Sequence, residues 1–214
     1  MDKLVPILVE FIPTSLLRKK ILCDMDSFHK FIKAFPHYTP SVFEEVRPFL
    51  FRKTIAIGDY FLRTGNSCNQ VGFIETGMLR LVYLRDGKEV TQCFCKENSI
   101  TTSYRGLITQ QKSDIAIQAV EPSELIVLSY DALQRLYAKS LFWQQVGRLA
   151  AENELLMLDE HTRFINDFSA TERYLHILHH QEFLLHRVPL NYLASYLQIS
   201  PETLSRIRKK ITRT

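Results

Sequence analysis

The stretch VPLNYLASYLQISPETLSRIRKKI, residues 188–211, decides how the end of this 214-residue chain folds. Pro189 suits the first turn of a helix, because proline has no N–H to lose there. Ser200 is a typical N-cap residue and Pro201 a typical first-turn residue, so a second helix is predicted to begin at position 201. The turn between the helices contains Gln198, where a positive φ would cost about 1 kcal/mol. The first helix has apolar residues at i, i+3, i+4 and i+7, which are Leu190, Leu193, Ala194 and Leu197.

The second predicted helix separates an apolar face from a basic one. Leu204, Ile207 and Ile211 form its inner face. Residues 187–214 contain six Lys or Arg and one acidic residue, although the whole chain carries a net charge of only +4. Two helices joined by a turn of three or four residues, with basic groups on the second, form the geometry that places a helix in the DNA major groove. Double-stranded DNA is therefore the expected partner, and a solvated amphipathic helix is the alternative.

A long helix is predicted before this pair. Residues 140–167 contain no proline and only Gly147 as a weak helix former, which indicates one helix of about 40 Å. We interpret a seam along it as a homodimer interface in which Asn153 fixes the register. Packing of the helix against its own chain is the alternative, since a stripe does not identify its partner. The seam recurs at spacings of three and four residues and comprises Val146, Leu149, Asn153 and Leu156.

The middle of the chain, about residues 49–129, has the two-residue period of β-strands. In residues 78–84 alternate side chains are expected to face opposite sides of a strand. Asp86-Gly87 predicts a type I′ hairpin turn, which requires positive φ at both central residues. Two short helices are expected before the strands, within residues 28–48. The predicted fold class is α+β: a cupin-like antiparallel β-roll with flanking helices, a long helix and a C-terminal helix-turn-helix.

Metal and catalytic chemistry have few residues to support them. The four cysteines, Cys23, Cys68, Cys93 and Cys95, show no CxxC or zinc-knuckle spacing, which favours reduced thiols in a cytosolic protein. Cupin-like rolls often hold a metal through histidines, but all seven histidines lie outside residues 49–129. We therefore predict no metal, no cofactor and no enzymatic activity.

Residues 1–24 are apolar but are interrupted by Pro6, Glu10 and Pro13, and they lack a signal-peptide cleavage site. A segment this short and this broken is not expected to span a bilayer. Met25 opens a stretch typical of a domain start, so residues 1–24 are interpreted as an appended segment or the product of a mistaken start codon. No membrane partner is predicted, and the expected location is the cytoplasm.

The order of parts, together with SPETLSRIRKK, SATERYL and GDYFLRTG, resembles the Crp/Fnr family of bacterial transcription regulators over about residues 28–213. The resemblance implies base contacts from Glu202 and Arg206, and the chemistry agrees, because Arg can bond guanine O6 and N7 together and Glu can accept from cytosine N4. Pro201 replaces the first arginine of the family pattern S-R-E-T-x-x-R, so the preferred DNA site is expected to differ. RNA polymerase is a partner implied by the resemblance alone. The residues assigned to DNA phosphates are Ser200, Thr203, Ser205, Lys209, Lys210 and Arg213.

Family members that bind cyclic nucleotides carry a Gly-Glu pair and, further on, an Arg followed by Ser or Thr. At the corresponding positions this chain has Thr101-Thr102 and Ser113-Asp114. The phosphate of a cyclic nucleotide would lose its cation and face an acid, which removes the strongest contact of such a pocket. We therefore expect no physiological response to cyclic AMP, although Arg105 is nearby in the sequence. No other small-molecule effector is identified.

These observations divide the chain into four parts. Residues 1–24 are the uncertain extension, 25–135 the cyclic-nucleotide-binding-like sensor roll, 136–167 the dimerisation helix and 168–214 the DNA-binding helix-turn-helix. A homodimer would place its two recognition helices about one DNA turn apart, on a pseudo-palindromic site. The alternative is a dimeric effector-sensing or protein-interaction module whose helix-turn-helix does not read DNA.

Overall fold

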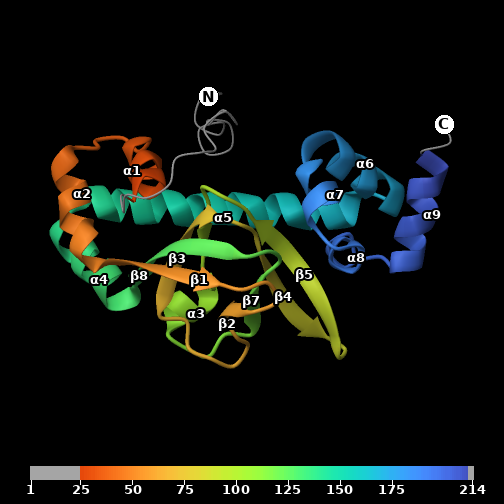
Figure 1. Ribbon diagram of the computed structural model, residues 1–214, viewed down its shortest axis with the longest axis horizontal. Coiled ribbons are helices and arrows are strands. Elements are labelled where there is room, and N and C mark those ends of the chain that lie inside the picture. Colours follow the sequence, from red (N-terminus) through yellow and green to blue (C-terminus); the bar gives the residue numbers. More distant parts are fainter. Residues whose placement is uncertain (1–24, 212–214) are drawn as a thin grey trace.

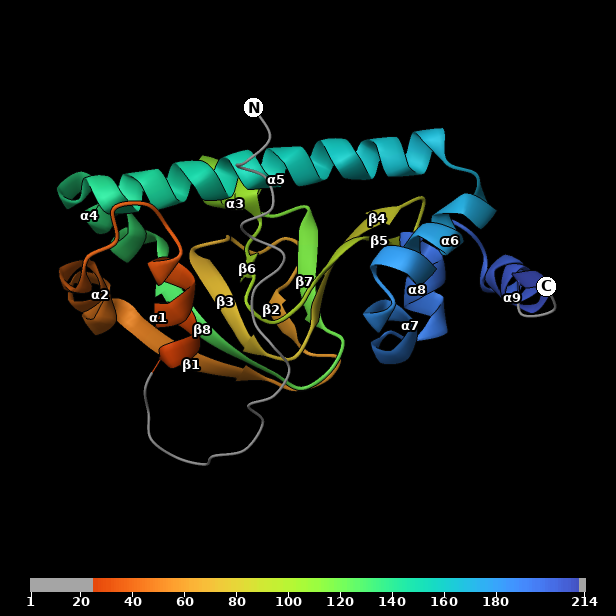
Figure 2. The same cartoon turned by 90° about the horizontal axis from the view of Figure 1, so that it is seen from above.

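The computed structural model describes residues 25–211, so the expectations for residues 1–24, Cys23 and Arg213 fall outside the described part of the chain. The described residues form a β-roll, a long helix that runs across it and a group of C-terminal helices (Figures 1 and 2). The predicted α+β architecture is therefore confirmed.

The roll consists of two four-stranded antiparallel sheets. One has the strand order β1-β8-β3-β6 and the other β2-β7-β4-β5. Side chains between the sheets form an apolar core in which Ile74, Ile117 and Leu125 are 0% exposed. The strands are β1 (Leu50–Ile55), β2 (Tyr60–Leu62), β3 (Gln70–Thr76), β4 (Leu79–Arg85), β5 (Lys88–Cys95), β6 (Ile100–Thr101), β7 (Ile115–Ala119) and β8 (Ser123–Ser129).

The β4–β5 hairpin turns at the predicted dipeptide. Asp86 and Gly87 have φ angles of 53° and 74°, as a type I′ turn requires. Further along β5 the register with β4 shifts between Thr91 and Cys93, which makes Gln92 an extra residue in the strand. This β-bulge matters because the N–H of Thr91 bonds outside the sheet, to a C-terminal helix.

Strand β4 is covered on both faces. Leu79 and Leu81 face the core of the roll, as the alternation predicted. Met78, just before the strand, and Arg80 are buried on the other side, where C-terminal helices pack against the roll. The alternating pattern indicated the strand but did not indicate this second cover, because it comes from residues far away in the sequence.

The turn between β3 and β4 requires a glycine. Gly77 has a φ of +94°, and a Cβ there would overlap Ser123 Oγ and lie 2.6 Å from the carbonyl oxygen of Pro122. We expect Gly77→Ala to lower the free energy of unfolding by roughly 2–5 kcal/mol, through backbone strain plus the clash. Urea denaturation measures this loss. Gly87→Ala is the control, because Gly87 also has positive φ but has open space around it; an equal loss in both variants would contradict the steric argument.

Helix α5 (Leu141–Asp167) confirms the predicted long helix. Phe142, Trp143 and Val146 in its first half share one buried core with three short helices and the outer face of the roll. The second half extends beyond these helices toward the C-terminal end of the molecule (Figure 2). The short helices are α1 (Asp26–Lys33), α2 (Pro40–Val46) and α4 (Tyr130–Lys139), and a 3-10 turn, η2 (Arg47–Phe49), follows α2.

The C-terminal helices include the predicted helix pair. Ser169 and Glu172 cap each other's backbone N–H groups before the first helix of the group. Gln198 has a φ of 52°, the positive value considered for this turn position. Leu197 and Leu204, both 0% exposed, lie in the common core of the group. The helices are α6 (Ala170–His180), α7 (Phe183–Arg187), α8 (Leu190–Tyr196) and α9 (Pro201–Ile211).

Candidate nucleic-acid interface

Helix α9 lies at the opposite end of the molecule from α4 (Figure 2). The polar side chains of one face of α9 are exposed to solvent. Glu202, Arg206 and Lys209 are exposed, and their spacings of four and three residues place them on one side of the helix. Leu204 is buried on the opposite side, and Ile207 beside it is half-buried. The apolar side fixes the helix to its own core, which leaves the charged side available to another molecule.

Hydroxyl groups organise the first turn of α9. The backbone N–H of Thr203 donates to Ser200 Oγ at 3.2 Å, which confirms Ser200 as the N-cap. Arg206 Nη2 donates to Thr203 Oγ1 at 3.1 Å. The hydrogen bond with Ser200 is the main cause that lowers the pKa of Glu202, and the charge of Arg206 adds to it. Glu202 is therefore a carboxylate at neutral pH, which accepts hydrogen bonds and does not donate them.

The residues predicted to contact phosphates differ in exposure. Ser200, Lys209 and Lys210 are exposed, whereas Thr203 and Ser205 are partly buried. The exposed Ser200, Lys209 and Lys210 are therefore better placed for contacts with a DNA backbone than the partly buried hydroxyls of Thr203 and Ser205.

Helix α8, which supports α9, is fixed to the roll by contacts that the sequence did not predict. Ser195 Oγ accepts from the backbone N–H of Thr91 at 2.9 Å and donates to the carbonyl oxygen of Glu89 at 3.0 Å. The ring of Tyr192 lies 3.5 Å from the guanidinium carbon of Arg80. The β-bulge in β5 thus provides a docking point for the helix-turn-helix.

Arg80 is a buried charge whose N–H groups donate to side chains of the two neighbouring strands, β5 and β7. Its side chain is 2% exposed. Its Nε donates to Gln118 Oε1 at 2.9 Å, its Nη1 to Thr91 Oγ1 at 3.3 Å, and its Nη2 to Glu89 Oε2 at 2.5 Å. A buried guanidinium is tolerated only with such a set of partners. The sequence signal for it was an arginine within the otherwise apolar run of residues 79–84.

The predicted dimer seam on α5 needs a correction at its first position. Val146 is 7% exposed and packs inside its own chain, because the first half of α5 lies over α1 and α4. Leu149 packs against the same core, while Asn153 is partly exposed and donates to Met157 Sδ at 3.5 Å. Exposed apolar side chains lie further along the helix, and because they are consecutive they point in different directions around it. They are Leu155, Leu156, Met157 and Leu158, which are 40 to 68% exposed.

The segment that corresponds to a phosphate-binding cassette surrounds helix α3 (Tyr104–Thr109). Ser113, at the position of the family arginine, is 3% exposed, and its Oγ lies 2.9 Å from Ser103 Oγ. Arg105 instead pairs with Asp114 at 2.8 Å, and both side chains are mostly exposed. The inward groups of this segment are therefore neutral hydroxyls, of which those of Ser103 and Ser113 bond to each other, and its charges face outward.

Cys93 and Cys95 lie two residues apart on strand β5. A hydrogen bond with the Cys95 thiol and burial both raise the pKa of Cys93. A raised pKa suppresses the thiolate that reacts with oxidants and metals. Within residues 25–211, no three His, Cys, Asp or Glu side chains are grouped so that they could hold a metal ion. The same residues include no helix with the length and apolar character needed to cross a membrane.

Comparison with known proteins shows which domain and which fold these features resemble. Residues 52–140 match the family model of the cyclic nucleotide-binding domain. Over 77 to 83% of its length the chain has the fold of Crp/Fnr-type regulators, as the sequence resemblance predicted.

Three solved structures illustrate the likeness. FixK2 from Bradyrhizobium japonicum has a TM-score of 0.67 at 16% identity, over 77% of this chain and 85% of its own. The c-di-GMP-responsive global regulator CLP from Xanthomonas campestris has a TM-score of 0.67 at 18% identity, over 82% and 92%. A putative transcriptional regulator of the Crp/Fnr family from Eubacterium rectale has a TM-score of 0.69 at 13% identity, over 83% and 87%. A comparison with curated proteins gave no match.

Proposed function

We propose that this protein is a sequence-specific DNA-binding transcription regulator of Crp/Fnr type. The observation that carries the proposal is helix α9, which presents Glu202, Arg206 and Lys209 on one exposed face while Leu204 anchors its other face in a core. A helix that is fixed on one side and charged on the other is what the major groove accepts. The likeness of the whole chain to Crp/Fnr regulators supports the same function.

The side chains of α9 divide into two kinds of contact. Arg206 reads a guanine through O6 and N7, and Glu202 accepts from the exocyclic amine of a cytosine. Phosphate contacts position the helix without specifying the sequence. The phosphate contacts within the described chain are Ser200, Thr203, Ser205, Lys209 and Lys210.

The active form in this proposal is a homodimer. The exposed apolar residues in the second half of α5 pair two chains, and Asn153 and Leu156 of the predicted seam belong to this region. A two-fold axis along paired α5 helices presents the two α9 helices to half-sites about 34–36 Å apart, so the operator is a pseudo-palindrome.

Cyclic AMP is not the effector in this proposal. The cassette offers a cyclic phosphate the hydroxyl of Ser113 in place of an arginine, and that hydroxyl already bonds to Ser103. Arg105 is held outward by Asp114. A phosphate would therefore be desolvated without the charge-assisted bonds that normally offset this cost.

Salt dependence separates DNA reading from a protein-binding role of the same helices. Lys209→Ala should weaken binding to all duplexes similarly and reduce the slope of log K against log salt by about 1, because one phosphate contact is lost. Fluorescence anisotropy at several salt concentrations measures both effects. Lys139→Ala, at the exposed end of α4 on the far side of the molecule, is the control and should change neither. A base-specific loss in Lys209→Ala would contradict the assignment of contacts.

A further inference from the structure

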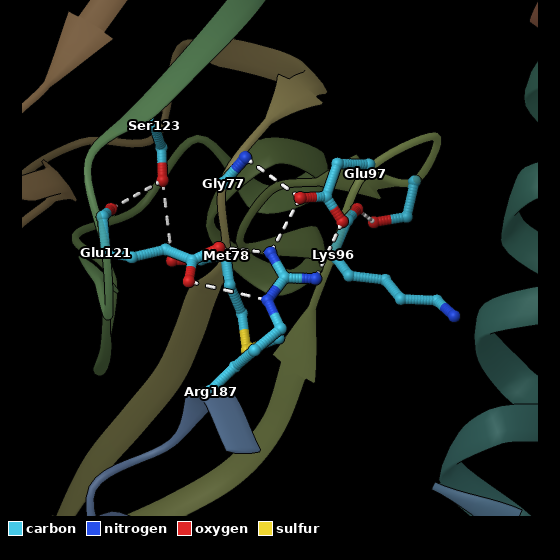
Figure 3. Close-up of polar contacts among 8 residues, drawn as sticks. Gly77, Met78, Lys96, Glu97, Glu121, Ser123 and Arg187 are labelled. Carbon is cyan, nitrogen blue, oxygen red and sulfur yellow. Dashed lines mark hydrogen bonds and ion pairs between the residues drawn. The ribbon is translucent and has the colours of Figure 1, made fainter. Parts of the chain in front are cut away.

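Arg187, the last residue of helix α7, connects the C-terminal helices to the roll (Figure 3). Its Nη1 and Nη2 donate to the two carboxylate oxygens of Glu97 at 3.0 and 2.6 Å. Its Nε donates to Glu121 Oε2 at 3.4 Å, and its Nη2 also bonds Glu121 Oε1. One guanidinium therefore forms two forked contacts with two acids at once, and forked Arg–carboxylate contacts have a defined geometry.

The turns of the roll hold the carboxylate of Glu97 and the backbone of Glu121 in place. Glu97 follows β5 and accepts a further hydrogen bond from the backbone N–H of Gly77 at 3.1 Å. Glu121 lies in the turn between β7 and β8, where Ser123 Oγ donates to its carbonyl oxygen at 2.8 Å. Three loops at one end of the roll thus form a prearranged acidic receptor for the cation.

The contact is partly shielded from solvent. The side chains of Arg187, Glu97 and Glu121 are 27, 32 and 28% exposed. Burial alone would raise the pKa of Glu97, but hydrogen bonds from Arg187 and from Gly77 outweigh it, and the pKa is lowered. Exposed ion pairs contribute little, whereas bidentate and shielded ones hold a geometry.

The need for such a contact follows from the short connection between α5 and the C-terminal helices. Helix α5 ends at Asp167 and α6 begins at Ala170, so Phe168 and Ser169 form a short joint. This joint alone does not determine the orientation of the following helices. The roll also contacts them through Met78, which lies in their core, and through the N–H of Thr91, which bonds Ser195. Arg187 adds a charged attachment of defined geometry at a separate point.

We propose that Arg187 is a positioning residue, which latches the helix-turn-helix to the roll through Glu97 and Glu121 and so holds α9 in one orientation without a bound effector. The latch goes beyond the proposed function, because it fixes the orientation of α9 before DNA binds. Its effect on DNA binding rests on the proposed function. The preset orientation removes the cost of selecting one conformation among several when DNA binds.

The amide of Thr91 gives a direct readout of docking, because Thr91 is 1% exposed and its N–H donates to Ser195 Oγ across the interface. Arg187→Gln should accelerate hydrogen exchange at Thr91 by at least about tenfold, while exchange at Ile126 in the roll core stays unchanged. His186→Gln, an exposed neighbour on the same helix, is the matched control and should leave both amides unchanged. Nuclear magnetic resonance resolves the individual amides.

A second variant guards against misfolding of the first. Glu97→Gln with Glu121→Gln removes the acids and leaves the cation, and it should accelerate Thr91 exchange to a similar extent. Adding Arg187→Gln to this pair should cause little further change, because residues of one network are not additive. Faster exchange at Ile126 in Arg187→Gln would mean that this change destabilises the roll itself. The Glu97→Gln, Glu121→Gln variant then tests the latch in its place.

DNA binding provides the second arm of the test. Arg187→Gln should weaken operator binding by about tenfold and leave the base preference unchanged, since only the fraction of correctly oriented molecules falls. Unchanged Thr91 exchange in both the single and the double variant would overturn the latch. If the wild-type chain binds no DNA, the proposed function fails, and Thr91 exchange still decides whether the latch exists.

Discussion

Replacing Arg206 with alanine is expected to weaken binding to the preferred operator by about 1–3 kcal/mol and to relax the base preference at one position in each half-site. Arg206 is exposed on α9 and is oriented by its hydrogen bond to Thr203 Oγ1. The methyl group of alanine cannot replace a bidentate contact to guanine. Operators with another base at this position lose less affinity in the variant, because Arg206 bound them less tightly. Binding to a set of single-base operator variants measures both effects.

Lys209→Ala is the comparison for this experiment, because Lys209 lies on the same face but is assigned to a phosphate. It should lower the affinity for every operator variant by a similar factor. If Arg206→Ala also lowers all affinities equally and keeps the original base preference, Arg206 does not read bases and the division of contacts on α9 is wrong.

Replacing Leu156 with glutamate is expected to weaken dimerisation by more than about 3 kcal/mol, because each chain would bury an unpaired carboxylate in the interface. Leu156 is 50% exposed in the single chain and lies beyond the part of α5 that packs on its own core. Loss of the dimer should also remove cooperative binding to two half-sites. Sedimentation equilibrium measures the dissociation constant.

Leu141→Glu is the control, since Leu141 is the most exposed leucine of α5, at 82%, and lies at its opposite end. This change should leave the dimer intact. A Leu156→Glu protein that still sediments as a dimer would mean that the chains associate through another surface, and the predicted spacing of the half-sites would no longer follow.

Local sequence signals predicted most of the elements that carry the candidate site. The hairpin at Asp86-Gly87 and the helix start at Pro201 appear at the predicted positions. Each depends on hydrogen bonds or dihedral angles within a few residues. Such features can be predicted from a short window, because the interacting groups are all inside it.

Contacts between distant segments could not be predicted in this way. Val146 fits a heptad whether α5 packs on a second chain or on its own, and only the folded chain distinguishes these cases. Arg187 counted as one more basic residue near the C-terminus, yet its partners Glu97 and Glu121 are 90 and 66 residues away. The buried Arg80 was placed on a strand, but the covering ring of Tyr192 was not foreseen.

The most direct test of the account is selection of bound duplexes from a random DNA pool by the purified protein, at two salt concentrations and with or without cyclic AMP. The account predicts a two-fold-symmetric motif whose half-sites are about one helical turn apart, enriched equally without the nucleotide and more weakly at higher salt. Enrichment that requires cyclic AMP would contradict the assignment of the cassette around Ser113. The absence of any motif under all conditions would contradict the central claim that helix α9 reads DNA.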